Sequence, residues 1–152
     1  MVVYGAGNLF AARWPDGTVG RIAVTSDTYA PLIRIPGGYQ SFQDVGIGFD
    51  SIWIATRETQ VQSGSLRTIV RGMVTQYAAV SGQEFVKTAI GRAADALAVD
   101  PAGGVWALDQ PDETVTRIDP TTGRPTQSIS LRHFAYGIAA RNGTVVISIQ
   151  SP

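Results

Sequence analysis

The sequence predicts an all-β fold in which one four-stranded antiparallel unit repeats along the chain, and two observations predict it. The first is a short alternating pattern headed by valine, which occurs at residues 19–22, 74–77 and 115–118. Eight residues after each valine comes a residue that favours a turn, and a second alternating stretch follows it. The three turn residues are Asp27, Gly82 and Gly123. Alternation with a period of two indicates strands.

The second observation is a pattern with a central aromatic residue, which precedes each copy of the valine pattern. The aromatic residues are Phe10, Trp53 and Trp106, and a fourth copy of the pattern has Val146 in their place. Self-similarity at about 40 to 50 residues, in units made only of strands, is typical of β-propeller blades. We therefore predict a β-propeller whose blades are four-stranded antiparallel sheets.

Each strand of the unit has a local justification. The first strand is made of small residues, which suit the crowded inner strands near a propeller axis. These segments are Val2–Gly5, Val45–Gly48, Ala96–Val99 and Gly137–Ala140. The aromatic residue of the second strand is expected to pack between neighbouring blades. The third strand carries the valine pattern. Outer fourth strands are expected at Pro31–Ile35, Glu84–Ile90 and Pro125–Leu131. Tight turns rich in glycine and asparagine, such as Arg141–Gly143, join the strands.

The chain contains three complete units and the first two strands of a fourth, which makes an incomplete ring of about three and a half blades. The expected blade boundaries are 1–36, 37–91, 92–131 and 132–152. Nine residues separate Phe10 from Val19, whereas twenty-one separate Trp53 from Val74. The second blade is therefore predicted to carry a loop insertion at about residues 57–72, which is where a surface scaffold tolerates extra length.

Three explanations account for the incomplete ring, because closed propellers typically have about four to eight blades. The chain is part of a longer propeller, or it assembles head to tail into a closed ring, or it persists as an open stack. The first explanation is favoured. An open array leaves unpaired strand edges, so we expect self-association of the isolated chain or the remainder of a longer propeller at those edges.

Composition excludes several classes of partner. Twelve basic and twelve acidic residues cancel, so no overall field attracts nucleic acid or an acidic membrane surface. The chain has no cysteine, which excludes disulfides and cysteine chemistry. No apolar run is long enough to span a membrane, and the first residues do not have the pattern of a signal peptide. The sequence leaves the compartment open.

Three segments resemble known bacterial propeller repeats. Residues 8–22 are similar to the streptogramin-lyase-like repeat, written roughly G-x-L-W-F-T-E…G-x-x-I-G-R-I. Residues 96–107 and 116–123 are similar to the YVTN and NHL repeats, which read I-A-V-D-P-x-G-x-V-W-V-A and R-I-D-P-x-T-G. The resemblance covers nearly the whole chain outside the insertion. It implies a propeller, and a function among extracytoplasmic sensor or binding domains, kinase-attached domains and a minority of enzymes.

The lyase branch of that group uses histidines and glutamates near the channel mouth to support a metal ion. Where the family has a P-H-G-I-A-V motif this chain has Tyr136 at the histidine position, and His133 lies three residues earlier. The family's W-F-T-E glutamate is replaced by Arg13, Thr56 and Asp109 in the three units. No G-x-S-x-G motif accompanies the lone histidine. We therefore expect no catalytic residue, no metal site and no cofactor. The alternative is Mg²⁺ or Ca²⁺ held with the help of Asp109.

Propeller geometry places the loops between strands two and three on the same face as those between successive blades. On this loop face, arginine is mixed with aromatic side chains, which are enriched at binding hot spots. The candidate ligand-binding residues are Arg13, Trp14, Tyr39, Arg57, Arg92, Asp109, Arg132 and His133. The predicted function is a non-enzymatic binding, interaction or sensor module for a protein, peptide or glycan. The alternative is a fragment of a metal-dependent enzyme of the lyase or lactonase type. Resemblance alone favours an extracytoplasmic location.

Overall fold

The computed structural model describes residues 1–5, 7–13, 16–23, 25–36, 41–61 and 68–150. Within these residues the chain forms fourteen strands and no helix. The strands make three sheets of four strands and one sheet of two, all antiparallel. The prediction of an all-β fold with an incomplete set of four-stranded sheets is confirmed. Among the described residues no helix is long and apolar enough to cross a membrane.

The first sheet pairs its strands in chain order. They are β1 (Val2–Gly5), β2 (Asn8–Arg13), β3 (Thr18–Ala23) and β4 (Thr28–Arg34). Asp27 lies in the turn before β4 with a φ of 49°, in the left-handed region that aspartate tolerates. The hairpin closes on this turn, since Ala23 pairs with Thr28. For that reason β4 begins before Pro31, where the sequence pattern placed its start.

The second and third sheets repeat this meander. The second sheet contains β5 (Phe42–Gly48), β6 (Ser51–Val61), β7 (Thr68–Ala78) and β8 (Glu84–Gly91). The third contains β9 (Ala96–Asp100), β10 (Gly104–Asp109), β11 (Thr114–Ile118) and β12 (Pro125–Ser130). Gly82 and Gly123 occupy the turns between their outer two strands, with φ of 70° and 65°. All three predicted turn residues thus adopt positive φ.

The fourth sheet has only two strands, β13 (Ala135–Arg141) and β14 (Thr144–Ile149). Asn142 and Gly143 connect them with φ of 54° and 77°. Two successive residues with positive φ match the right-handed twist of a hairpin, as the Asn-Gly pair predicts. The carboxylate of Asp100 accepts hydrogen bonds from the backbone N–H groups of Asn142 (3.2 Å) and Gly143 (2.5 Å). This joins the third sheet to the fourth.

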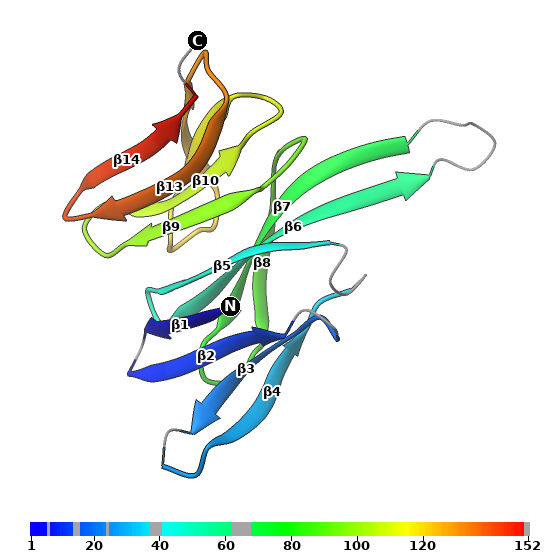
Figure 1. The fold of residues 1–152 in the computed structure, drawn as a ribbon, viewed down its shortest axis with the longest axis vertical. Coiled ribbons are helices and arrows are strands. Elements are labelled where there is room, and N and C mark those ends of the chain that lie inside the picture. Colours follow the sequence, from blue (N-terminus) through cyan, green and yellow to red (C-terminus); the bar gives the residue numbers. More distant parts are fainter. Residues whose placement is uncertain (6, 14–15, 24, 37–40, 62–67, 151–152) are drawn as a thin grey trace.

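The inserted residues of the second sheet lengthen its two middle strands. β6 and β7 each have eleven residues, and they pair without a register shift from Ser51 with Ala78 to Val61 with Thr68. The resulting hairpin projects away from the other strands (Figure 1). The extra residues therefore extend a hairpin of the sheet and leave the pairing of the other strands unchanged.

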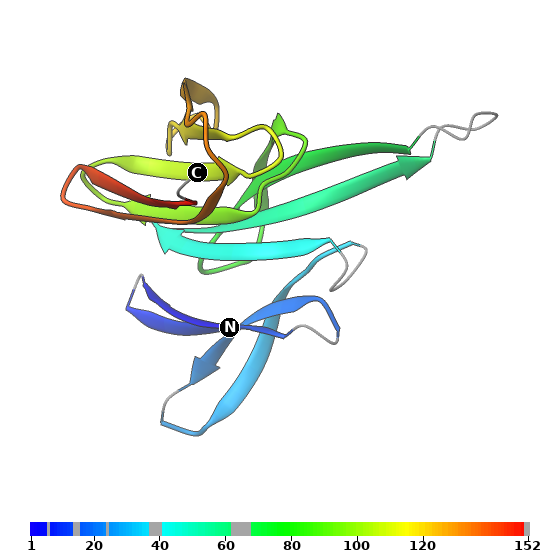
Figure 2. The same ribbon diagram turned by 45° about the horizontal axis from the view of Figure 1, so that its top comes forward.

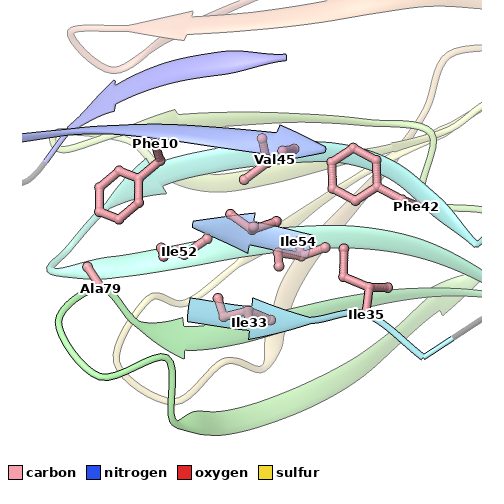
Figure 3. Close-up of a cluster of buried hydrophobic side chains, with 10 residues drawn as sticks. Phe10, Ile33, Ile35, Phe42, Val45, Ile52, Ile54 and Ala79 are labelled. Atoms are coloured by element: carbon pink, nitrogen blue, oxygen red, sulfur yellow. The ribbon is translucent and has the colours of Figure 1, made fainter. Parts of the chain in front are cut away.

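The four sheets lie in a row, with the first sheet at one end and the fourth at the other (Figures 1 and 2). Buried apolar side chains fill the spaces between consecutive sheets. Between the first and second sheets, Phe10 and Ile33 of one meet Phe42, Ile52 and Ile54 of the other (Figure 3). Stacked sheets that bury side chains only against their immediate neighbours are the architecture of a propeller.

The aromatic residues of the second strands occupy these junctions, as predicted. Phe10 packs between the first two sheets, and Trp53 between the second and third. Trp106 packs between the third and fourth sheets but is only half-buried. Since the fourth sheet has two strands, it covers only part of the third, and every residue of β12 is exposed.

The inner strands approach each other closely at glycines. A Cβ atom on Gly5 would lie 2.2 Å from the side chain of Ile47, and one on Gly48 would lie 2.4 Å from Val99. Such distances are shorter than any real carbon contact, so only glycine fits there. The small residues predicted for the inner strands are thus needed because side chains of the next sheet occupy the space beside them.

Candidate functional site

Six connections lie at the same end of the strands, because neighbouring strands alternate in direction. They are the β2–β3, β4–β5, β6–β7, β8–β9, β10–β11 and β12–β13 loops. We call this end the loop face. Five of the eight predicted site residues belong to the described parts of these loops or to the strand ends beside them, namely Arg13, Arg92, Asp109, Arg132 and His133. Arg57 lies within β6, where its hairpin begins to extend. Trp14 and Tyr39 lie outside the described residues.

Arg13 makes its contacts within the first sheet. Its guanidinium lies 3.5 Å from the carboxylate of Asp16 and 5.3 Å from the centre of the Tyr29 ring. The Thr18 hydroxyl donates to Asp16 at 2.8 Å, and this hydrogen bond is the main cause of a lowered pKa for Asp16. A hollow of about 480 Å³ opens beside these residues and continues along β4. Arg13 is exposed, so its charge is available at the edge of this hollow.

Arg57 connects the second sheet to the third. Its Nη2 atom donates to Oδ1 of Asp95 at 2.6 Å, and the Asp95 side chain is only 8% exposed. The other carboxylate oxygen of Asp95 accepts the backbone N–H of Gln110 at 3.0 Å. The ion pair thereby fixes the root of the long hairpin to the β8–β9 and β10–β11 loops.

Asp109 is fully buried at the end of β10. Its Oδ2 accepts the backbone N–H groups of Arg92 (2.8 Å) and Ala93 (3.2 Å), and its Oδ1 accepts that of Asp112 (3.0 Å). Gly91 makes room for it, because a Cβ there would lie 2.2 Å from Asp109 Oδ2. Asp109 thus fastens the β8–β9 loop to the β10–β11 turn.

Arg92 completes this fastening from the outside. Its side chain donates to Asp112 and to the carbonyl of Pro111. Burial raises the pKa of Asp109, whereas the hydrogen bond from Arg92 lowers the pKa of Asp112. The structure therefore brings Arg57, Arg92 and Asp109 to one junction between the second and third sheets, where each of them bonds to other residues of the chain.

Arg132 and His133 lie in the next loop, between β12 and β13, and both are exposed. The two residues that follow at alternate positions, Phe134 and Tyr136, are 39% and 59% exposed. Their rings meet edge to face, with centroids 5.3 Å apart and planes inclined by 74°. We call Arg132, His133, Phe134 and Tyr136 the aromatic patch.

Backbone hydrogen bonds hold the aromatic patch in place. The N–H of Leu131 donates to Glu113 at 2.8 Å, and the N–H of Gln150 donates to Phe134 at 2.8 Å. The Tyr136 hydroxyl donates to Gln150 Oε1 at 3.1 Å. Arg132 and His133 are predicted from the sequence, whereas the ring pair is not. The i, i+2 spacing of two aromatic residues at the start of a strand is the signal that places them on one face.

The described carboxylates and the histidine of the loop face are not arranged as ligands of a shared metal ion. In the described part of the chain, no three histidine, aspartate or glutamate side chains come together as ligands. The neighbouring carboxylates Asp109 and Asp112 accept backbone N–H groups and an arginine. His133 lies on a different loop from both.

No protein-family model matches the sequence, and no curated protein matches it. Solved structures are similar to it in fold. A streptogramin B lyase structure aligns with 97% of this chain and 61% of its own length, at 10% identity and a TM-score of 0.50. The WD40 β-propeller domain of Doa1 aligns with 97% of this chain and 59% of its own length, at 10% identity and a TM-score of 0.48. The chain thus spans about three fifths of the propellers it matches. Its consecutive antiparallel sheets and its likeness to streptogramin B lyase identify the chain as a partial β-propeller.

Proposed function

We propose that the chain is a non-enzymatic binding module that presents its loop face to a protein or peptide. The observation that carries this proposal is the aromatic patch. Two rings in edge-to-face contact are left exposed beside an arginine and a histidine, on a loop that backbone hydrogen bonds hold at both ends. Tyrosine and arginine are enriched among the few residues that supply most of the binding energy at protein interfaces. A preformed patch also loses little side-chain entropy on binding.

The chemistry of the aromatic patch favours a peptide segment with an apolar or aromatic side chain next to a carboxylate. The ring pair supplies apolar area, and the Arg132 guanidinium presents a planar donor fork suited to a carboxylate. A glycan that stacks on the tyrosine is the competing ligand class, which the experiment below distinguishes.

The alternative function, a metal-dependent lyase or lactonase, would need Asp109 and Asp112. Asp109 is fully buried and engaged with three backbone N–H groups, and Asp112 is held by Arg92. A metal ion bound to either carboxylate would compete with these contacts for the carboxylate oxygens. We therefore expect millimolar MgCl₂ or CaCl₂ to leave the melting temperature unchanged. An increase that Asp112→Asn abolishes would instead favour the enzyme.

The test is binding of the chain to peptide and glycan arrays, followed by affinity measurements on the hits. A double variant, Phe134→Ala with Tyr136→Ala, removes the ring pair, and Phe85→Ala removes an aromatic side chain of similar exposure (57%) on β8 as the matched control. We expect acidic-aromatic peptides among the hits, and a loss of about thirty-fold or more in affinity for the double variant alone, corresponding to a hot spot of about 2 kcal/mol. Hits confined to glycans, or peptides that bind both variants equally, would contradict the proposal.

A further inference from the structure

The first sheet has an apolar face that no other described residue covers. Along β1 and β2, side chains alternate between the face that meets the second sheet and the opposite face. Val3 and Phe10 point to the second sheet. Their neighbours Val2, Tyr4 and Leu9 therefore share the opposite face. Ile22 and Tyr29 also belong to it, because Ile22 pairs with Leu9 and Tyr29 pairs with Ile22. Tyr4 is 75% exposed there, and Val2 is 57% exposed.

Equivalent positions in the other sheets are buried or half-buried. The pairing registers align Val2, Tyr4 and Leu9 with Val45, Ile47 and Ile52 of the second sheet and with Leu97, Val99 and Val105 of the third. Those six residues pack against the preceding sheet in the apolar clusters. The first sheet thus has the same apolar pattern as its neighbours, on a face that meets no preceding sheet within the described residues. A hollow of about 640 Å³, lined in part by Tyr4, Leu9 and Ile22, lies over this face.

The fourth sheet has the complementary face. Val146 occupies the position of Phe10, Trp53 and Trp106, each of which packs on the sheet that follows it. Because no described sheet follows the fourth, Val146 is 63% exposed, and a hollow of about 380 Å³ lies beside it and Ala139. Ile138 and Ile147, on the other face, pack against the third sheet.

We propose that the exposed face of the fourth sheet packs on the exposed face of the first sheet of a second copy of this chain. Every junction between the described sheets joins these same two kinds of face. One face carries the residue at the position of Phe10, and the other carries the residues at the positions of Val2, Tyr4 and Leu9. One chain has one of each left uncovered, at opposite ends of its row of sheets (Figures 1 and 2). The contact is heterologous, and two copies related by half a turn would form two such contacts and close a ring.

The number of sheets agrees with a pair of copies. Each copy contributes four sheets, so two copies contribute eight. Eight is at the upper end of the roughly four to eight blades in closed propellers, and three copies would exceed it. This inference does not depend on the proposed ligand, because the aromatic patch lies on the loop face and the two terminal faces lie on the flanks of the sheets.

The test measures the mass of the chain in solution by light scattering at about 100 µM. We expect a dimer for the wild-type chain and monomers for Tyr4→Arg and for Val146→Arg, since each places a charge in the contact. Both side chains are largely exposed, so the variants should fold, which circular dichroism checks. Phe85→Arg adds the same charge to β8 and is expected to remain a dimer.

Mixing the two variants provides the decisive result. The Tyr4→Arg chain retains an intact fourth sheet, and the Val146→Arg chain retains an intact first sheet, so a mixture should form a one-to-one heterodimer through one contact. A wild-type chain that stays monomeric at about 100 µM would overturn the proposal, because the covering sheets would then come from another source. A dimer that survives both substitutions, or a mixture that stays monomeric, would also overturn it. A dimer that persists in both variants would point to symmetric pairing of the β14 edges of two copies.

Discussion

Truncation of the tryptophans at successive junctions should destabilise the chain by unequal amounts. Trp53 is 1% exposed between two complete sheets, and its indole N–H donates to the Gly48 carbonyl at 3.2 Å. Trp53→Ala removes this hydrogen bond and leaves a cavity, so we expect a loss of about 4 kcal/mol in the free energy of unfolding.

Trp106 occupies the equivalent position at the incomplete junction. Its side chain is half-buried, and its buried indole N–H has no hydrogen-bond partner among the described residues. Trp106→Ala removes less buried area and also an unsatisfied donor, although it loses the contact with the Arg117 guanidinium 5.8 Å from the ring centre. We therefore expect a smaller loss, about 2 kcal/mol.

Urea unfolding followed by far-UV circular dichroism measures both losses, at a concentration of about 1 µM so that association does not contribute. Val146→Ala is the control, and it should change stability by less than about 0.5 kcal/mol because that side chain is exposed in the single chain. Equal losses for the two tryptophans, or a larger loss for Trp106, would refute the view that the fourth sheet covers the third only in part.

Three further perturbations test the junctions. Gly72→Ala would place a Cβ 2.0 Å from the backbone of Ala93, so we expect a loss above about 2 kcal/mol in urea unfolding, whereas Gly137→Ala, with its nearest contact at 3.5 Å, should be tolerated. Asp100→Asn should destabilise the chain at pH 7, because the Gly143 N–H and its neighbours lower the pKa of Asp100 in the folded state below the ordinary 3.8. That contribution is present above pH 3.8 and is lost as the pH falls through the folded pKa, so the difference in melting temperature between variant and wild type should shrink in acid. A melting-temperature difference that stays constant in acid would count against this role of the Asp100 carboxylate. Arg57→Met should cost about 1 kcal/mol, and less in 1 M NaCl, because the Arg57 side chain of the ion pair with Asp95 is 40% exposed. Thermal melts at two salt concentrations that show no salt dependence would argue against an electrostatic role.

The sheets could be predicted from the sequence because their signals are local. Period-two alternation and a turn residue at a fixed distance determine where strands begin and end, and Asp27, Gly82 and Gly123 all adopt the positive φ that the turns require. The position of Phe10 and Trp53 between sheets follows from the same repeat. The strand β4 begins at Thr28 and not at the predicted Pro31, because Tyr29 and Ala30 pair with β3 directly after the Asp27 turn.

The candidate site was harder to predict because its contacts join distant residues. Asp109 was named for its position in a repeat, but its burial depends on the backbone of residues 92–93, which the chain brings back from the preceding sheet. Sequence alone does not show which carboxylates meet such N–H groups and which face solvent. The contact between Phe134 and Tyr136 depends on their short spacing in the sequence. It can be predicted if strand β13 is taken to begin at Ala135, because the two side chains then lie on the same face.

The most direct test of the account is whether the inner strands of consecutive sheets touch. Nuclear Overhauser contacts between the Val99 methyl groups and the α-protons of Gly46 and Gly48 would show the second and third sheets in contact, and contacts between Ile47 and Gly5 would show the same for the first and second. We predict both sets. If the Val99 and Ile47 methyl groups showed Overhauser contacts only with protons of their own sheets, the propeller arrangement would be contradicted.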